Sequence, residues 1–295
     1  METLELLNRK IKTAEDLLSV VKTMKSLAAV NIRQYELAVE SLEEYKHIVD
    51  MGWQVLLRRS GPVALRARSK GTACMIFGSD QGMCGQFNEI ILSTALEEAD
   101  RLKAQALDVT LWGVGEKISN ALMDSGHPSG EAFPVPGSVS SINAQVQEMV
   151  QSIESWRSSK KTEHVYLCHN TLAKGGGYEQ TFYRLLPLDS DWIKEYKALQ
   201  WPGRCLPTMG LSQALMFTHL FRQHLFVSLY RAFAQSLASE NAARLMAMQA
   251  AEKNILERKD ELQALFREQR QTAITSELFD IISGFEVLSD EMAGV

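Results

Sequence analysis

The sequence predicts an α/β fold: a long antiparallel coiled coil of N- and C-terminal helices plus a central Rossmann-like α/β domain. Three observations support this. Apolar residues near the N-terminus recur every 3.5 residues on average, strand-like runs alternate with amphipathic stretches in the middle, and a helical pattern returns after Pro207. The expected boundaries are 1–60 for the first helix, 71–200 for the α/β domain and 208–290 for the last helix.

The first helix is predicted from a series of positions spaced alternately by three and four residues. From Leu7 to Leu56 this series is apolar except at Lys25 and Lys46. Residues 1–51 contain neither proline nor glycine, so nothing interrupts a helix there. A 3.5-residue period is typical of a left-handed coiled-coil seam, and about 55 residues would extend about 80 Å. Gly61-Pro62 and the basic stretch at 66–71 are expected to end the helix.

In the middle of the chain, short apolar and β-branched runs alternate with amphipathic ones. Expected strands are 72–77, 109–112, 165–168 and 181–188, and expected helices are 89–104, 116–124 and 141–156. Such alternation favours a largely parallel sheet. Residues 126–137, with three of the seven prolines, are expected to form a loop, and the glycines at 175–177 a hairpin-like one.

The last helix is expected to be longer than the first. Its apolar residues near the end repeat by four and three, at Ile274, Leu278, Ile281, Phe285 and Leu288. The first helix is too short to cover this tip, and an exposed apolar stripe of that size usually marks an interface. Two alternatives are a fraying tail and a tip folded back onto the α/β domain.

Composition excludes several classes of protein. A net charge of −5 disfavours a nucleic-acid binder, and four scattered cysteines without a CxxC pair favour free thiols in a reducing compartment. The acidic start has no apolar run typical of a signal peptide, and no stretch resembles a membrane span. We therefore expect a soluble chain, cytoplasmic by default.

The sequence contains no strong motif for a nucleotide, metal or catalytic site. The glycines at 78–85 lack a GKS or GKT ending, and Gly113-Val-Gly115 lacks the third glycine of a dinucleotide turn, so both are interpreted as structural turns. His219 and His224 are five residues apart, a poor spacing for one metal ion. No Ser, His and acid set stands out. The sequence predicts no catalytic residue, no metal and no cofactor.

Three parts of the sequence, the last of them made of two runs, carry a resemblance to a known family. They are Lys22-Thr-Met24-Lys-Ser-Leu-Ala-Ala29, then Gly78-Ser-Asp-Gln-Gly-Met-Cys-Gly-Gln-Phe-Asn88, and two C-terminal runs at 240–251 and 270–284, which begin Glu240-Asn-Ala-Ala-Arg244 and Arg270-Gln-Thr-Ala-Ile. In order and spacing they resemble F-type ATP synthase gamma subunits over nearly the whole length. Gln81 stands where the family usually has Arg, and Gln86 where it has Gly. The sequence around residue 80 is similar to that of the alternate bacterial branch called N-ATPases, often thought to pump sodium ions.

The resemblance implies a central rotor shaft that couples transmembrane ion flow to conformational cycling of the catalytic subunits. Its implied partners are three alpha and three beta subunits, an epsilon subunit and a ring of c subunits, with no nucleic acid and no direct small-molecule ligand. Such a chain is not itself an enzyme, and we expect it neither to bind nor to hydrolyse ATP. The implied location is peripheral, on the cytoplasmic face of the bacterial inner membrane.

The resemblance also assigns residues to contact with the catalytic ring. Five of them match family positions that touch the catalytic subunits, and two apolar ones belong to the C-terminal tip. They are Met24, Arg244, Arg270, Gln271, Thr275, Ile281 and Phe285. The family's usual tyrosine-rich stretch before Trp201-Pro202 is missing, so no residue is assigned to the c-ring contact.

Two other classes of function remain open from the residues. One is a static coiled-coil scaffold with an α/β recognition domain, which would form a symmetric self-assembly. The other is an α/β enzyme with helical arms, which the missing nucleotide motifs disfavour. A native mass spectrum of the purified complex distinguishes a single copy within a larger ring from either alternative.

Overall fold

The computed structural model describes residues 3–59, 70–127, 129–159, 163–174, 177–205 and 207–293, without the side chains of Ser190 and of 283–293. It divides into two compact units: a coil unit of Met1–Leu27 and Ala247–Val295, and an α/β unit of Ala28–Met246. The elements are α1 (Leu4–Arg59), β1 (Gly71–Phe77), α2 (Phe87–Ala104), β2 (Asp108–Val114), α3 (Glu116–Asp124), β3 (Ser129–Phe133), α4 (Val139–Ser158), β4 (His164–Leu172), β5 (Tyr178–Leu186), α5 (Ser190–Ala198) and α6 (Gln213–Ala293).

Helix α1 buries one side chain in every seven. These residues are at most 9% exposed and are Leu7, Ala14, Val21, Ala28, Tyr35, Leu42, Val49 and Leu56. The predicted positions between them, such as Ile11, Leu18 and Ile32, are half-buried as far as Lys46, whereas Trp53 is fully buried. A seven-residue repeat of buried positions is the pattern of a helix that keeps one face against a partner helix. The predicted seam on the first helix is therefore confirmed.

Polar pairs give the direction of the partner helix. In the coil unit, the Lys25 ammonium binds the Glu252 carboxylate, and Lys259 Nζ lies 2.9 Å from Glu15 Oε1. Moving forward along α1 from 15 to 25 thus means moving backward along α6 from 259 to 252, so the helices are antiparallel. Lys46, the other interruption of the apolar series, pairs with Asp50 on its own helix at 2.8 Å.

The α/β unit contains one five-stranded sheet in the order β3-β2-β1-β4-β5. Strands β3, β2, β1 and β4 are parallel, with β1 in the centre, and β5 pairs antiparallel with β4. The largely parallel sheet is therefore confirmed. The hairpin joining β4 to β5 is closed by the Ala173 N–H, which donates to the Gly177 carbonyl at 3.2 Å, while Gly175 and Gly176 lie outside the described residues.

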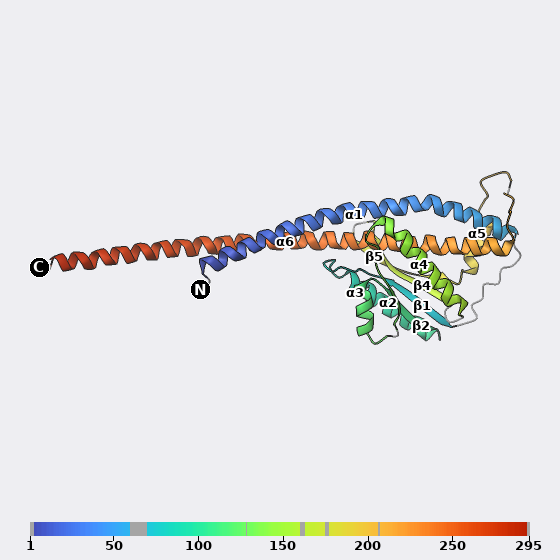
Figure 1. Cartoon of the computed structure of the whole chain (residues 1–295), viewed down its shortest axis with the longest axis horizontal. Helices are drawn as coiled ribbons and strands as arrows, with labels where there is room; N and C mark the ends of the chain where they lie inside the picture. Colours follow the sequence, from blue (N-terminus) through green and yellow to red (C-terminus); the bar gives the residue numbers. More distant parts are fainter. Residues whose placement is uncertain are drawn as a thin grey trace. The chain divides into compact units, whose positions relative to one another are not determined.

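The two faces of this sheet are covered differently (Figure 1). Alternate residues of β1 point to opposite faces, as expected for a pleated strand. Cys74 and Ile76 pack with α2 and α3, whereas Met75 and Phe77 pack with α4 and with the parts of α1 and α6 that belong to this unit. The terminal helices therefore complete the core of the α/β unit.

The structure differs from the sequence prediction in two places. Strand β3 lies inside the stretch 126–137, where a loop was expected, so that prediction was wrong for 129–133. Only Phe133 of β3 is buried, which leaves no apolar alternation to detect. The helix α5 was not predicted. It is nine residues long, and its start is capped by the Asp189 carboxylate, which accepts from the Asp191 N–H. Gly61-Pro62, expected to end α1, lies outside the described residues.

A first prediction concerns Trp53, which is fully buried and joins three elements of the α/β unit. Its ring meets Trp192 of α5 and Phe217 of α6 edge-on, at centroid distances of 5.3 and 5.5 Å. Trp53→Ala should lower the free energy of unfolding by about 3–5 kcal/mol, because a large core side chain leaves a cavity. Urea unfolding followed by circular dichroism measures this, with the half-exposed Trp201→Ala as control. Equal midpoints for the two variants would contradict the assignment.

Candidate functional site

The glycine-containing turn after β1 is held by its own polar groups. Asn88 accepts from the Ser79 N–H at 3.0 Å and donates to the Ser79 hydroxyl at 2.8 Å. The Asp80 carboxylate accepts from the N–H groups of Glu116 and Val135, at 2.8 and 3.2 Å. A helix N-terminus is a favourable site for a phosphate group, and here the start of α3 is occupied by the Asp80 carboxylate. The polar groups of the turn are therefore used to hold β1, the turn and α3 together.

Two glycines allow this close packing. A Cβ atom on Gly78 would lie 2.0 Å from Ile118 Cγ1, inside van der Waals contact. Gly115 has a φ of +106°, and a Cβ there would lie 2.9 Å from the Ser79 carbonyl oxygen. Both positions require glycine to bring β1, the turn and α3 together. This agrees with the interpretation of both motifs as structural turns.

Arg244, one of the predicted ring contacts, lies against this turn. Its guanidinium binds the Glu240 carboxylate at 2.7 Å and donates to the Gly82 carbonyl at 3.4 Å. The side chains of Arg244 and Glu240 are only 11% and 8% exposed. Burial raises the pKa of the Glu240 carboxyl above its ordinary value, and the neighbouring Arg244 opposes that rise. Arg244 thus keeps a buried carboxylate paired.

A small apolar cluster lies beside this ion pair. Cys84 and Phe87, from the turn and the start of α2, pack with Ala243 of α6, and Tyr178 stacks edge-on against Phe87 at 5.5 Å. Arg244 therefore helps to fasten the turn onto α6 within the α/β unit. The sequence resemblance assigned Arg244 only to an external partner, and this internal contact is new.

The remaining predicted contact residues belong to the coil unit. Met24 is half-buried on α1, and Arg270, Gln271 and Thr275 are exposed on α6. The Thr275 hydroxyl donates to the Gln271 carbonyl at 2.8 Å. Within the described part of the chain, the side chains of Arg270 and Gln271 have no polar partner. Their donors are therefore free for another molecule.

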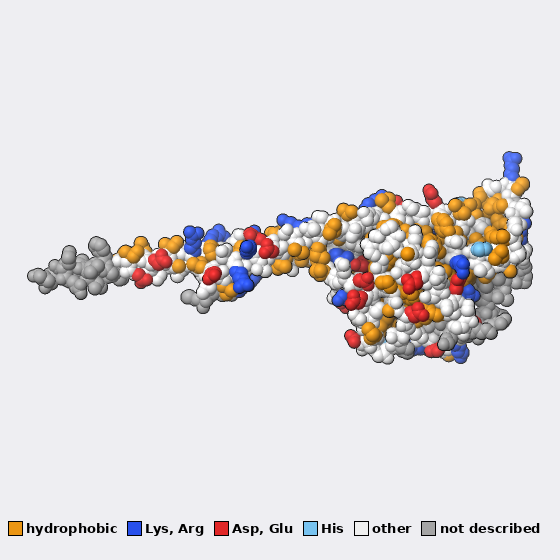
Figure 2. Space-filling view, in the orientation of Figure 1, with side chains coloured by type: hydrophobic (Ala, Val, Ile, Leu, Met, Phe, Trp, Pro, Cys, Tyr) orange, Lys and Arg blue, Asp and Glu red, His pale blue; other side chains and the backbone are white. Residues whose placement is uncertain are grey.

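Past these polar residues, α6 exposes large apolar side chains. They are 45–69% exposed and are Ile274, Leu278, Phe279, Ile281 and Ile282. Figure 2 shows hydrophobic side chains at the surface along this described part of α6. Phe279 and Ile282 extend the stripe that the sequence predicted to a wider face. The side chain of Phe285, also predicted to belong to this surface, lies outside the described residues.

The coil unit also has a groove that the sequence analysis missed. Its volume is about 490 Å³, and Leu6, Leu17 and Ile255 line it together with the basic Arg9 and Arg258. Leu6 and Leu17 are exposed and lie outside the buried heptad positions. An apolar floor with a basic rim is suited to an acidic, amphipathic partner segment. Leu6 and Leu17 each lie one position before the predicted seam residues Leu7 and Leu18, so the seam periodicity did not reveal them.

The described residues contain neither a candidate membrane span nor a candidate metal site. No helix in the described ranges combines the length and apolar character that a membrane crossing requires. Among the described His, Cys, Asp and Glu side chains, no three come together in a way that could hold a metal ion.

Comparison with known proteins identifies similar chains. A family model described as ATP synthase matches residues 3–288. The ATP synthase gamma chain of Sulfurihydrogenibium sp. is 28% identical, covering 96% of this chain and 97% of the relative, and that of Geobacter metallireducens is 25% identical, covering 97% and 99%. A chain in the cryo-EM structure of the Euglena gracilis mitochondrial ATP synthase, OSCP/F1/c-ring, has a similar fold, with a TM-score of 0.65 at 15% identity over 97% of this chain and 94% of that one.

The buried pair of Arg244 and Glu240 leads to a second prediction. Arg244→Ala should lower the free energy of unfolding of the isolated chain by about 3 kcal/mol, because it leaves the Glu240 carboxylate buried without a partner. Arg258→Ala, which breaks an exposed pair with Glu261, should cost less than about 0.5 kcal/mol. Urea midpoints of both variants provide the measurement. A loss no greater for Arg244→Ala than for Arg258→Ala would show that the turn does not depend on this pair.

Proposed function

Because this chain belongs to the ATP synthase gamma-chain family, we propose that its paired helices form the central shaft of an F-type ATP synthase or ATPase, with the α/β unit as a docking body. The gamma chain is a non-catalytic subunit of that complex. The structural observation that carries the proposal is the exposed apolar tip of α6, which requires a surrounding partner to bury it.

The partners follow from this role. Three alpha and three beta subunits would surround the tip of α6, an epsilon subunit would dock on the α/β unit, and a ring of c subunits would carry the base of the shaft. The chain is then part of the membrane-associated complex. Its finer location, which we propose from the resemblance, is the cytoplasmic face of a bacterial inner membrane.

The shaft works as a selector of conformations. A single asymmetric chain inside a ring of three catalytic subunits presents a different face to each one. Each orientation therefore stabilises an open or a closed catalytic site, and rotation moves each subunit through these states in turn. Torque is transmitted only if the contacts between shaft and ring differ among the three positions.

We assign the polar part of this contact to Arg270 and Gln271, with Thr275 beside them. All three side chains are exposed on α6, and those of Arg270 and Gln271 have no polar partner among the described residues. A guanidinium makes a directional, charge-assisted hydrogen bond to a carboxylate, so a carboxylate on a catalytic subunit is the expected acceptor. Met24 is expected to pack beside this contact from α1. The apolar part comprises Ile281 and its neighbours, with Phe285 as the predicted continuation.

The polar contact yields a third prediction. Replacing Arg270 and Gln271 together by Ala removes a charge-assisted bond worth about 1.5–3 kcal/mol. If that bond stabilises the rate-limiting orientation, ATPase turnover of the reconstituted ring complex should fall about tenfold or more. Nucleotide affinity of the catalytic sites should change far less, because the shaft contributes no atoms to them. The matched control is Arg267→Ala with Gln263→Ala, one to two turns earlier on the same helix.

Turnover is compared only after native mass spectrometry has shown one variant chain per assembled ring. Normal turnover of the assembled Arg270→Ala, Gln271→Ala complex would mean that torque passes through shape alone, and the site assignment would fail. A symmetric assembly of this chain by itself in the same spectrum would instead favour the static scaffold.

The apolar tip yields a fourth prediction. Leu278 and Ile281 are 55% and 69% exposed in the isolated chain, and both should be buried in the complex. Changing both to Asp places charges at a buried contact, so recovery of the chain with alpha and beta subunits should fall about tenfold or more. Met123→Asp, at an equally exposed apolar residue of α3, should leave recovery unchanged. Full recovery of the double variant would show that the ring does not enclose the tip.

A further inference from the structure

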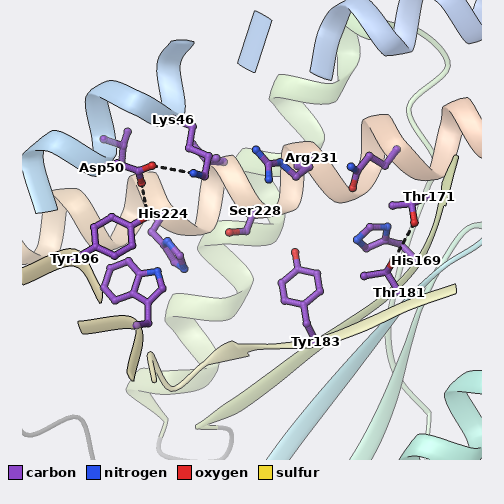
Figure 3. A pocket seen from close by; sticks show the side chains of 14 residues that line it. Lys46, Asp50, His169, Thr171, Thr181, Tyr183, Tyr196, His224, Ser228 and Arg231 are labelled. Atoms are coloured by element: carbon purple, nitrogen blue, oxygen red, sulfur yellow. Dashed lines mark hydrogen bonds and ion pairs between the residues drawn. The ribbon is translucent and has the colours of Figure 1, made fainter. Parts of the chain in front are cut away.

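A half-enclosed cavity of about 370 Å³ lies inside the α/β unit (Figure 3). Four parts of the unit form its walls: α1 at Lys46 and Asp50, α6 from His224 to Gln235, α5 at Trp192 and Tyr196, and the strands β4 and β5. The volume falls within the range of small-molecule sites. Most of its wall residues are polar, which is unusual between a sheet and its covering helices.

The only carboxylate that lines the cavity is already neutralised. Asp50 accepts from the Tyr196 hydroxyl at 2.7 Å and from the Lys46 ammonium at 2.8 Å (Figure 3). Thr171 and Thr181 bond to each other at 2.9 Å. These three contacts stiffen the two ends of the cavity, and they leave the Lys46 ammonium with further N–H groups to donate.

The middle of the cavity is lined by hydrogen-bond donors that are not in use. The Arg231 guanidinium binds Glu43 through Nη2, but its Nε is buried and has no partner. Among the described residues, the Tyr183 and Ser228 hydroxyls and the His224 ring also have no hydrogen-bond partner. In Figure 3, Arg231, Tyr183 and Ser228 face a common space. Unused donors gathered in one cavity are suited to a ligand rich in acceptor oxygens.

Burial fixes the protonation of these groups near neutral pH. It lowers the pKa of His224 and of His169 to about 4, so both rings are uncharged. It raises the pKa of Tyr183 to about 12, so that hydroxyl keeps its proton. His169 Nδ1 lies 3.2 Å from the Asn170 carbonyl oxygen and must donate to it, which leaves Nε2 as an acceptor. One wall therefore accepts a hydrogen bond while the others donate.

We propose that this cavity binds a small phosphate-type oxyanion, either free phosphate or a small phosphate monoester, through Arg231, Tyr183 and Ser228. The oxyanion supplies several acceptor oxygens for the unused donors, and a protonated oxygen of the ligand meets His169 Nε2. The sequence indicated no small-molecule ligand, and the proposal departs from that expectation.

Other ligand classes fit the cavity less well. A metal ion would find a single carboxylate, already bound by Lys46 and Tyr196. A cationic ligand would meet the Arg231 and Lys46 side chains. A purely apolar ligand would leave the buried Arg231 Nε without a partner, which is unfavourable. Of these ligand classes, an oxyanion best satisfies the donors that the walls present.

Occupancy would connect elements that are distant in sequence. Arg231 and Ser228 belong to α6, Tyr183 belongs to β5, and Lys46 belongs to α1. A ligand bonded to all of them ties both long helices to the sheet, so it should stiffen the α/β unit and raise its melting temperature. This inference does not depend on the proposed role of the chain in a larger complex.

Calorimetric titration of the full isolated chain tests the proposal, with sodium phosphate and glycerol 3-phosphate as probes and sodium chloride of equal ionic strength as the blank. Saturable binding and a raised melting temperature are expected. Tyr183→Phe and Ser228→Ala should each raise the Kd about tenfold, because each removes one hydrogen bond to a charged oxygen. Both variants are conservative, and circular dichroism confirms that they fold.

The matched control is Tyr166→Phe, which removes the same hydroxyl from β4 on the opposite face of the sheet, where Tyr166 stacks on Phe182. It should leave the Kd unchanged. Tighter binding of glycerol 3-phosphate supports a monoester, and equal or tighter binding of phosphate supports the free anion. Absence of saturable binding for both probes, or an unchanged Kd in both cavity variants, overturns the proposal.

Discussion

The burial of one α1 side chain in every seven is the constraint on which the rest of the structure depends. It fixes which face of α1 packs against another element, and in the α/β unit it also places these side chains in the core of the sheet. Leu42, Val49 and Leu56 belong to the same apolar core as Met75 and Phe77 of the central strand. The seam between the long helices and the second face of the sheet are therefore one continuous core, and disturbing either one disturbs both.

Sequence patterns predicted the elements whose stability comes from regular apolar burial. The buried positions of α1 repeat every seven residues, and β1, β2 and β4 contain short runs of consecutive buried residues, so a single chain reveals them. Strand β3 was not predicted because its residues are held by backbone pairing with β2, and only Phe133 is buried. Helix α5 was not predicted because nine residues are too few to show a clear period, and its stability comes from packing on Trp53.

Some features of the candidate sites could likewise be predicted from the sequence, and others could not. The glycine turns could be predicted as structural because they lack the residues that phosphate binding needs. The contact of Arg244 with Glu240 and Gly82 could not be predicted, because the neighbour that a helical side chain meets depends on tertiary packing. The oxyanion cavity left no trace in any local motif, since its walls come from α1, α5, α6 and two strands. What distinguishes it is a set of unused donors, and only the folded chain reveals which donors are unused.

The two ion pairs across the coil unit have a consequence for mechanical load along the helix axes. Lys25 faces Glu252, and Lys259 lies seven positions further along α6 than Glu252. The apolar seam repeats every seven residues, so it would tolerate a slip of one heptad with little change in packing. That slip, in one direction, would bring Lys25 opposite Lys259 and set two ammonium groups against each other. The charges therefore act as a stop against axial shear, which a purely apolar seam would lack.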